Sequence, residues 1–359
     1  MIGTRLKLAR TAAGLSLREL EGQIDGLVTA QAIGKYERDE MMPSSSVLIA
    51  LARALKVSED YLLNPADVEL VGVEFRKKQL TSAKETAEVR ACILSEVERY
   101  LEVERILAIE SPKLFPLAKR PLVESLDDAE EAAGQLRKLW GLGEDPIPDF
   151  CELLEEKGIK VCALSMPENV SGVQAEVRAT NEQFLPVIVV NRVHPGERQR
   201  FTLAHELGHM YLRMAGAADP EKACNRFAGA FLVPAKMLIR EVGPRRKDIS
   251  IRELFQLKAR FGASAQAIAY RCKDLGIFEQ SLFAQVFKMF NANHWRFREP
   301  NELPGERPQR FERLCIRALS EGVISEAKAS ELLGTTVREL VARLDKPPED
   351  GADGDAPRV

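Results

Sequence analysis

The sequence has few histidines and cysteines, and it has no long apolar run. Only four of its 359 residues are His and six are Cys. The cysteines lie far apart and none forms a CxxC pair, so we expect reduced thiols rather than disulfides. No stretch approaches the ~18 apolar residues of a transmembrane helix, and the N-terminal MIGTRLKLAR lacks the apolar core of a secretory signal. These absences predict a cytoplasmic protein without a membrane partner.

An excess of charge of one sign is also missing. The chain has 51 basic and 54 acidic residues, which gives a formal net charge of −3. This balance does not indicate nucleic-acid binding, so any DNA contact must come from a local patch. Hydrophobic residues make up 45% of the chain, which is enough for sizeable cores, and the length predicts two or three domains.

Residues 1–65 have the pattern of short helices joined by tight turns. Ser16 is followed three residues later by Glu19, which is the spacing of a capping box at a helix start. Thr29 has the position of an N-cap for a short third helix over residues 30–36. This pattern predicts an all-α N-terminal domain.

The rest of the chain has both helical and β-rich patterns, so we predict a mainly α fold with a small β-sheet, in the α+β class. The predicted parts are a helical connector at 66–125, a central domain at 126–245, a C-terminal helical region at 246–345 and a disordered tail at 346–359. Residues 81–110 have the periodicity of one long amphipathic helix, and the prolines at 112, 116 and 121 indicate a linker after it. This helix is either a dimer element of a homodimer or a helix that packs on its own domain.

In the central domain, β-rich runs lie between helical runs. We expect strands at 159–164, 172–177 and 187–191, and helices at 127–140, 149–157, 198–214 and 220–232. The C-terminal region is expected to be helical over 249–344, with a break near the prolines of 300–308.

The strongest chemical signal is His-Glu-Leu-Gly-His at residues 205–209. An α-helix turns once every 3.6 residues, so His205 and His209 project from one helix face, one turn apart. Two imidazoles at that spacing can bind one tetrahedral Zn²⁺. Glu206 lies beside the first imidazole, where it can act as general base toward the attacking water and return the proton to the leaving amine. The motif therefore predicts a zinc site with Glu206 as the catalytic residue.

A catalytic zinc site needs a third protein ligand. Glu221 and Asn225 are four residues apart and share one helix face. Glu221 can complete a His₂Glu ligand set, and Asn225 can bond a ligand histidine and fix its tautomer. Alternatively, Glu221 is an ordinary acidic residue in the first turn of a helix. Asp219 and Glu241 are reserve candidates for the third ligand, and His194 is a candidate for the wall of the cleft.

Two blocks, RQRFTLAHELGH (198–209) and EKACNRFAGAFLVP (221–234), resemble the ImmA/IrrE family of metallopeptidases, and the likeness covers residues 130–275. The resemblance implies a gluzincin-like zincin domain, because the second block keeps a Glu-xxx-Asn pairing. The family often has a further acid two residues before this Asn, where the chain has Ala223. Stand-alone members cleave a helix-turn-helix repressor, which implies that the protein substrate is such a repressor or the chain itself.

Residues 3–62 resemble the Cro/C1 (XRE) helix-turn-helix family through RTAAGLSLREL (10–20) and TAQAIGKYE (29–37). The resemblance implies that the third helix lies in the major groove of a double-stranded DNA operator. The residues expected to contact DNA are Thr29, Ala30, Gln31 and Lys35 at base edges, with Arg5, Arg10, Arg18 and Arg38 at phosphates. Residues 1–63 hold as many acidic as basic groups, so a helix-turn-helix retained for protein contact is the alternative.

These patterns leave three functions open. The first is a transcriptional regulator that binds an operator and whose zinc-dependent endopeptidase domain acts on a helix-turn-helix repressor or on itself. The second is a non-enzymatic repressor or antitoxin, with a cognate toxin as partner, whose metal domain is a sensor or scaffold. The third is a protein-interaction module with a vestigial site. For the enzyme, Tyr211, His294 and Arg298 are candidates for stabilising the tetrahedral intermediate.

Overall fold

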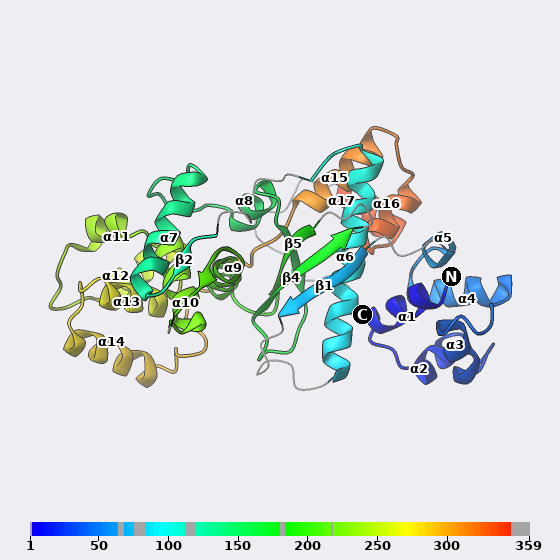
Figure 1. Ribbon diagram of the computed structural model, residues 1–359, viewed down its shortest axis with the longest axis horizontal. Helices are drawn as coiled ribbons and strands as arrows, with labels where there is room; N and C mark the ends of the chain where they lie inside the picture. The colour runs from blue at the N-terminus through cyan, green and yellow to red at the C-terminus, as the bar shows by residue number, and fades with distance from the viewer. Residues whose placement is uncertain are drawn as a thin grey trace. The chain divides into compact units, whose positions relative to one another are not determined.

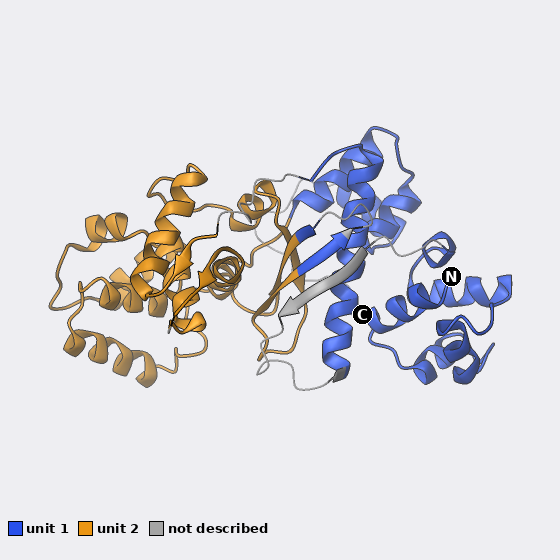
Figure 2. Cartoon of the chain, viewed as in Figure 1, with its two compact units in different colours: residues 1–112, 176–185, 309–359 blue, residues 113–175, 186–308 orange. Residues whose placement is uncertain are grey.

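The computed structural model describes residues 2–63, 68–74, 83–111, 120–179, 184–216 and 218–345. The chain divides into two compact units, which are coloured separately in Figure 2. Unit 1 comprises residues 1–112, 176–185 and 309–359, and unit 2 comprises residues 113–175 and 186–308. None of the described helices is both long enough and apolar enough to cross a membrane. The predicted linker prolines at 112 and 116 and the predicted disordered tail at 346–359 lie outside the described residues.

The N-terminal helices of unit 1 form a small all-α bundle, as the sequence predicts (Figure 1). They are α1 (Gly3–Ala12), α2 (Leu17–Gln23), α3 (Ala30–Glu37), α4 (Ser45–Leu55) and α5 (Glu59–Leu63). The predicted capping box between Ser16 and Glu19 is present, and the Thr29 hydroxyl accepts a hydrogen bond from the Ala32 N–H at the start of α3. Ile33 and Tyr36 are buried, so α3 keeps one face in the core and presents the other to solvent.

A long helix, α6 (Ala83–Ile106), is the second part of unit 1, and it confirms the predicted amphipathic helix. It packs against α1 of the bundle and against two C-terminal helices, α15 (Arg310–Ser320) and α16 (Glu326–Leu333), while α17 (Val337–Leu344) follows α16. Tyr100 of α6 stacks on Phe311 of α15 with ring centroids 5.4 Å apart. Because Ile93, Val97 and Val103 are fully buried within the unit, packing on its own domain accounts for the apolar face of α6.

Unit 2 holds the helices and most of the strands of the central region. Its helices are α7 (Leu126–Leu139), α8 (Phe150–Glu156), α9 (Gly196–Tyr211), α10 (Pro220–Leu232), α11 (Ala235–Val242), α12 (Ile251–Phe261), α13 (Ala265–Asp274) and α14 (Gln280–Ala292). One sheet has the strand order β1-β4-β5-β3, from β1 (Val68–Glu74), β4 (Gly172–Ala179), β5 (Phe184–Asn191) and β3 (Lys160–Leu164). By residue number β1 belongs to unit 1, as do the last residues of β4 and the first of β5. β3 pairs parallel with β5, with Lys160 opposite Val187.

Helix α9 lies at the centre of the core of unit 2. It packs against α10, which in turn packs against α7 (Figure 1). Phe227 and Phe231 of α10 stack with ring centroids 5.6 Å apart and are fully buried, and burying each such side chain stabilises the fold by about 1.5–3 kcal/mol. A Cβ on Gly208 would lie 3.1 Å from the Phe227 ring. The glycine of the His-Glu-Leu-Gly-His motif therefore allows α10 to approach α9 closely.

The predicted helix at 198–214 is wrong at its C-terminal end. α9 ends at Tyr211, and Leu212 is extended, with ψ at 140°. Arg213 and Met214 form β6, which pairs parallel with β2 (Leu122–Val123). This long-range pairing overrides the helical pattern, and the neighbouring sequence does not predict it.

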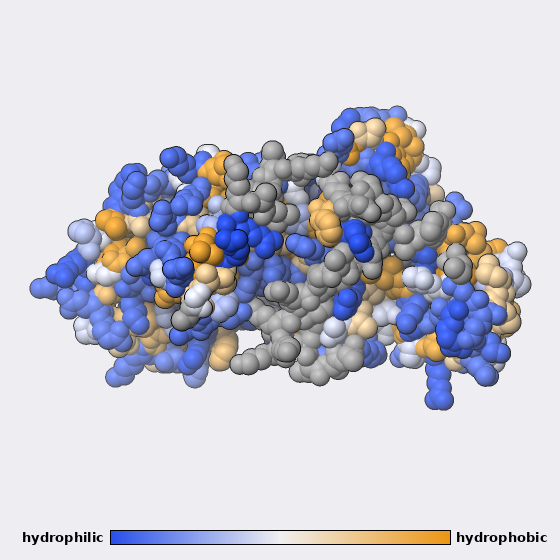
Figure 3. All heavy atoms as spheres, in the orientation of Figure 1, coloured by the Kyte–Doolittle hydropathy of each residue, from blue (hydrophilic) through white to orange (hydrophobic). Residues whose placement is uncertain are grey.

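Three other expectations need correction. Residues 66–125 are not only helical, because β1 and β2 lie there. Pro234 follows α10 and stands at the N-cap of α11, a further helix that lies outside the predicted ones. The C-terminal region is helical with a break before α15, as expected, yet α12–α14 belong to unit 2 and α15–α17 to unit 1. Where Figure 3 colours the surface by hydropathy, hydrophilic side chains predominate, with hydrophobic ones in small groups between them.

Candidate metal centre and nucleic-acid interface

His205, His209 and Glu221 converge on one point between α9 and α10. Their ligand atoms all lie within 4.8 Å of one another. His205 Nε2 is 3.0 Å from His209 Nε2 and 3.7 Å from Glu221 Oε2, and His209 Nε2 is 3.5 Å from Glu221 Oε1. His205 is buried, while 48% of the Glu221 side chain is exposed, so the point of convergence is open on the carboxylate side.

The spacing of these three groups fits a divalent ion. Zinc bonds to nitrogen and carboxylate oxygen are about 2.0–2.2 Å long, so neighbouring ligands of a tetrahedral ion lie about 3.3–3.6 Å apart. The three measured distances, 3.0, 3.5 and 3.7 Å, bracket that value. Two imidazoles and one carboxylate are also the ligand set of hydrolytic zinc sites, with a fourth position left for water. The residues present therefore fit a zinc ion.

Asn225 fixes the orientation of the first imidazole. Its Oδ1 lies 2.8 Å from His205 Nδ1. An amide oxygen only accepts hydrogen bonds, so this contact favours the tautomer with the proton on Nδ1, in which Nε2 presents its lone pair to the ligand cluster. Asn225 comes one turn after Glu221 on α10, so one helix face supplies both the carboxylate and the group that orients the imidazole.

Glu206 is buried beside the cluster, next to the first residue of β4. A Cβ on Gly172 would lie 2.3 Å from Thr202 Cγ2, 2.8 Å from the Val189 carbonyl oxygen and 3.6 Å from Glu206 Cγ. The backbone of β4 can therefore approach this turn of α9 because residue 172 has no side chain. The close approach shields Glu206 on the sheet side.

The reserve candidates for metal binding have other roles. The Asp219 side chain caps α10 by accepting hydrogen bonds from the N–H groups of Glu221 and Lys222. Glu241 forms an ion pair with Arg260 at 3.1 Å. Neither carboxylate belongs to the cluster of His205, His209 and Glu221, the one group of this kind found in the described parts of the chain.

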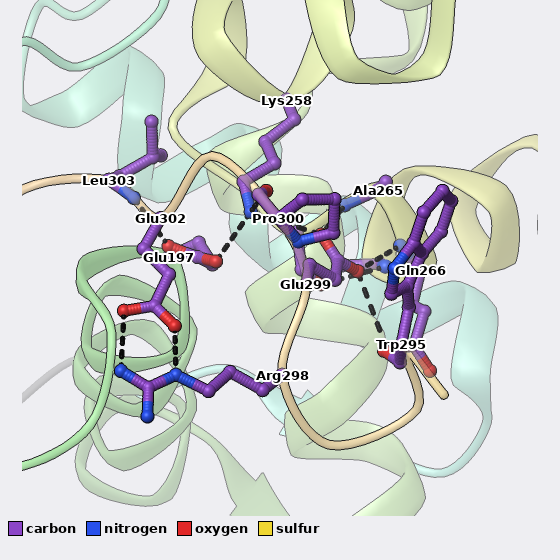
Figure 4. Close-up of polar contacts among 12 residues, drawn as sticks. Glu197, Lys258, Ala265, Gln266, Trp295, Arg298, Glu299, Pro300, Glu302 and Leu303 are labelled. Atoms are coloured by element: carbon purple, nitrogen blue, oxygen red, sulfur yellow. Dashed lines mark hydrogen bonds and ion pairs between the residues drawn. The ribbon is translucent and has the colours of Figure 1, made fainter. Parts of the chain in front are cut away.

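The remaining candidates differ in their surroundings. His194 is buried and its Nε2 contacts the Glu168 carbonyl oxygen at 2.9 Å, while burial and nearby Arg198 lower its pKa. Tyr211 is buried, and burial raises its pKa. His294 and Arg298 are exposed, and Arg298 is paired with Glu302, as Figure 4 shows.

A cleft of about 900 Å³ lies beside the cluster, and no pattern in the sequence predicts it. Its lining includes Arg198 and Phe201 of α9, Lys222 and Asn225 of α10, and Tyr270 of α13, together with residues of the segment after α14. Asn225 thus both lines this cleft and bonds His205. The lining comes from separate elements, so no contiguous sequence pattern could have indicated it.

One wall of the cleft is the segment at 295–303, which a buried charge cluster holds in place (Figure 4). Lys258 Nζ lies 2.5 Å from Glu197 Oε1 and 3.2 Å from Glu299 Oε2, and all three side chains are at most 3% exposed. Glu197 also accepts a hydrogen bond from the Leu303 N–H, and Glu299 accepts from the Ala265 N–H. The wall is therefore fastened to α9, α12 and α13.

Most of the predicted DNA-contact residues lie on the surface of the N-terminal bundle. Thr29, Gln31, Lys35, Arg18 and Arg38 are exposed, and Ala30 is half-buried. The Thr29 hydroxyl is the cap of α3. Glu21 Oε2 accepts a hydrogen bond from the Ala30 N–H at 3.1 Å, which places a carboxylate at the start of α3. Arg38 is paired with Glu40, so the surface near α3 carries little net positive charge.

The phosphate contacts predicted for Arg5 and Arg10 do not agree with the structure. Arg5 is buried, forms an ion pair with Glu98 of α6, and has its guanidinium 4.7 Å from the centre of the Tyr61 ring. Arg10 is largely buried and forms two hydrogen bonds with Glu37, at 2.5 and 2.9 Å. Both guanidinium groups are engaged in packing the bundle, which the sequence pattern could not show.

Two family models match parts of the chain that include these elements. A helix-turn-helix family model matches residues 6–62. A second model, described as the IrrE N-terminal-like domain, matches residues 154–273, which include α9 and α10. No curated protein matches the chain. The chain therefore combines a helix-turn-helix region at 6–62 with a region at 154–273 that is similar to the IrrE N-terminal-like domain.

Proposed function

We propose that this protein is a DNA-binding transcriptional regulator whose IrrE-like domain is a zinc-dependent endopeptidase. The convergence of His205, His209 and Glu221 at tetrahedral spacing is the observation that carries the proposal. The buried Glu206 on the same helix turn supports it, because a general base is the further group that peptide hydrolysis requires. The Glu221 side of the cluster is exposed, which leaves room for a substrate to approach that point.

Each side chain has a separate task in the proposed reaction. His205, His209 and Glu221 hold the ion, and Asn225 keeps His205 in the tautomer that presents Nε2. A zinc ion held by these three side chains would lower the pKa of water and polarise the peptide carbonyl. Glu206 accepts a proton from the attacking water and returns it to the nitrogen of the leaving amine. No side chain is assigned to the developing oxyanion, because the Tyr211 ring packs against Phe227, with centroids 6.1 Å apart, and a residue two positions after His209 projects from a different helix face.

The helix-turn-helix domain directs the regulator to double-stranded DNA. Gln31 and Lys35 on the exposed face of α3 are the proposed base contacts, and Arg18 and Arg38 are the proposed phosphate contacts. The family resemblance favours a helix-turn-helix repressor, or the chain itself, as the cleaved protein. The alternative is a non-enzymatic repressor or antitoxin that uses the same metal site as a sensor.

The Glu206→Gln variant tests the enzymatic proposal. The amide cannot accept the proton, so the variant should keep its zinc and its DNA affinity while cleavage stops. The zinc-loaded parent and variant are incubated with helix-turn-helix repressors and alone, with and without a chelator, and products are identified by mass spectrometry. Cleavage by the variant at the parent rate would contradict the role of Glu206. A zinc-loaded parent that cleaves neither repressors nor itself would assign the chain to the non-enzymatic alternative.

A further inference from the structure

The cleft beside the metal cluster presents positive charge that is not neutralised by the cleft's own acids. Among its lining residues, Arg198 donates a hydrogen bond to the Ser171 hydroxyl rather than to a carboxylate, and Lys222 Nζ is 3.9 Å from Asp219. Arg296 is exposed, and no ion pair of its side chain occurs among the described residues.

The acidic residues of the cleft lining are engaged elsewhere. Glu197 and Glu299 are both buried against Lys258, and Asp274 is paired with Arg226 at 3.1 Å. The groups left to meet a ligand are therefore cations, which favour a ligand of negative charge.

The same cleft also presents exposed aromatic rings. Phe297 is 84% exposed and Tyr270 is 51% exposed, and both line the cleft. Phe297 does not owe its exposure to a loose segment, because its neighbours are anchored (Figure 4). The Gln266 amide donates to the Trp295 carbonyl oxygen at 2.9 Å, and the Glu299 carboxylate accepts from the Gln266 N–H at 3.0 Å. A large apolar side chain held rigidly at a rim is typical of an anchor for a partner's apolar side chain.

The cleft lies next to the metal cluster along two helices, although none of the three proposed ligands lines it. On α9, Arg198, Phe201 and His205 follow one another at spacings of three and four residues, so they share a helix face. On α10, Lys222 and Asn225 line the cleft, directly after and one turn after Glu221. A chain that lies in the cleft and extends one further turn along α9 would therefore meet the cluster.

We propose that this cleft is the substrate-binding groove and that it selects peptide segments in which acidic residues flank an apolar side chain. Arg198, Lys222 and Arg296 bind the acidic groups, and Phe297 and Tyr270 cover the apolar side chain. This inference rests on the proposed peptidase function and specifies its substrate class. A peptide fits better than nucleic acid because it offers carboxylates and an aliphatic or aromatic side chain together, which matches both sets of lining residues.

Binding to the uncleaving variant tests the groove. Full-length Glu206→Gln protein, loaded with zinc, is titrated into short fluorescein-labelled peptides rich in Glu, Leu and Phe, and affinity is read as fluorescence anisotropy. The probes for comparison are the same peptides with Lys in place of Glu and a single-stranded oligonucleotide. The acidic peptide should bind about tenfold or more tightly than its Lys counterpart, and added salt should weaken it.

Variants of the lining give the decisive comparison. Replacing Arg198 and Arg296 together by Glu should weaken the acidic peptide about tenfold or more, and Phe297→Ser should weaken it about tenfold. Arg252→Glu, at an exposed position of α12 outside the cleft, is the matched control and should change nothing. The proposed groove would be wrong if the acidic peptide and its Lys counterpart bound equally, or if the lining variants kept the parental affinity for the acidic peptide. An oligonucleotide that binds more tightly than the peptide and is lost in the same variants would assign the cleft to nucleic acid.

The binding assay separates this inference from the proposed function. If the acidic peptide binds selectively but the parent protein cleaves nothing, the groove proposal stands and the peptidase proposal is wrong. If the parent cleaves in a Glu206-dependent way and the lining variants cleave equally well, the peptidase proposal stands and the groove proposal is wrong.

Discussion

Replacement of Lys258 by Met should destabilise unit 2 strongly. The Lys258 side chain is 1% exposed and neutralises two carboxylates, Glu197 and Glu299, that are each 3% exposed. Met fills a similar volume but leaves two negative charges buried without a counter-ion. Breaking a buried ion pair from one side costs about 3–5 kcal/mol, a large share of the total of about 5–15 kcal/mol that keeps a domain folded. For a unit of this size, that loss should lower Tm by about 6–20 °C.

Thermal unfolding followed by calorimetry and circular dichroism measures this loss. Lys288→Met, at an exposed position of α14, is the matched control and should stay within about 0.5 kcal/mol of the parent. Adding Glu299→Gln to Lys258→Met should recover part of the lost stability, because one uncompensated charge is removed. If Lys258→Met changes Tm no more than the control does, the charge cluster does not hold the 295–303 segment as argued.

Three further predictions concern metal affinity, pH dependence and DNA binding. Asn225→Ala should weaken zinc binding about 10–100-fold without unfolding the chain, measured by competition with a fluorescent chelator, and parental affinity would contradict its orienting role. Burial raises the pKa of Glu130, but its hydrogen bonds with Arg271 and the charge of Arg271 outweigh this and hold the pKa below its ordinary value. Its stabilising contribution is therefore present at neutral pH and lost as the pH falls through the lowered pKa, so Glu130→Gln should reduce Tm more at pH 7 than at pH 3, and an equal reduction would refute the assignment. Gln31→Ala should weaken operator binding by about 1–3 kcal/mol in a gel-shift titration while non-specific binding is unchanged, and a uniform loss on all sequences would argue against base contact.

The parts of the fold that the sequence predicts are those with local causes. The capping groups of Ser16 and Thr29 act within three residues, so sequence spacing alone reveals them. The same holds for His205 and His209, because a helix fixes which side chains share a face. Glu221 was one of several acids that could have approached the imidazoles. It took the packing of α10 on α9, allowed by Gly208, to distinguish it from Asp219.

The features that the sequence does not predict depend on distant partners. Arg5 is a basic residue of the type that contacts phosphates, but in the structure it is buried and forms an ion pair with Glu98, which lies far along the chain. Leu212 follows a helical pattern, yet it is extended because β6 pairs with β2. From the sequence, Phe297 is an ordinary apolar residue of a loop. The structure shows that its ring is exposed while the neighbouring residues are held by hydrogen bonds. In each case tertiary contacts override the local preference.

The metal content of the purified protein tests the central claim most directly. The parent, dialysed against zinc and then against buffer, should hold about one zinc per chain by mass spectrometry under native conditions. His209→Ala should hold none, because two remaining ligands do not retain the ion, whereas His294→Ala, which changes an exposed loop histidine, should keep the parental content. A parent without bound zinc, or a His209→Ala variant that keeps it, would contradict the metal centre on which the proposed peptidase depends.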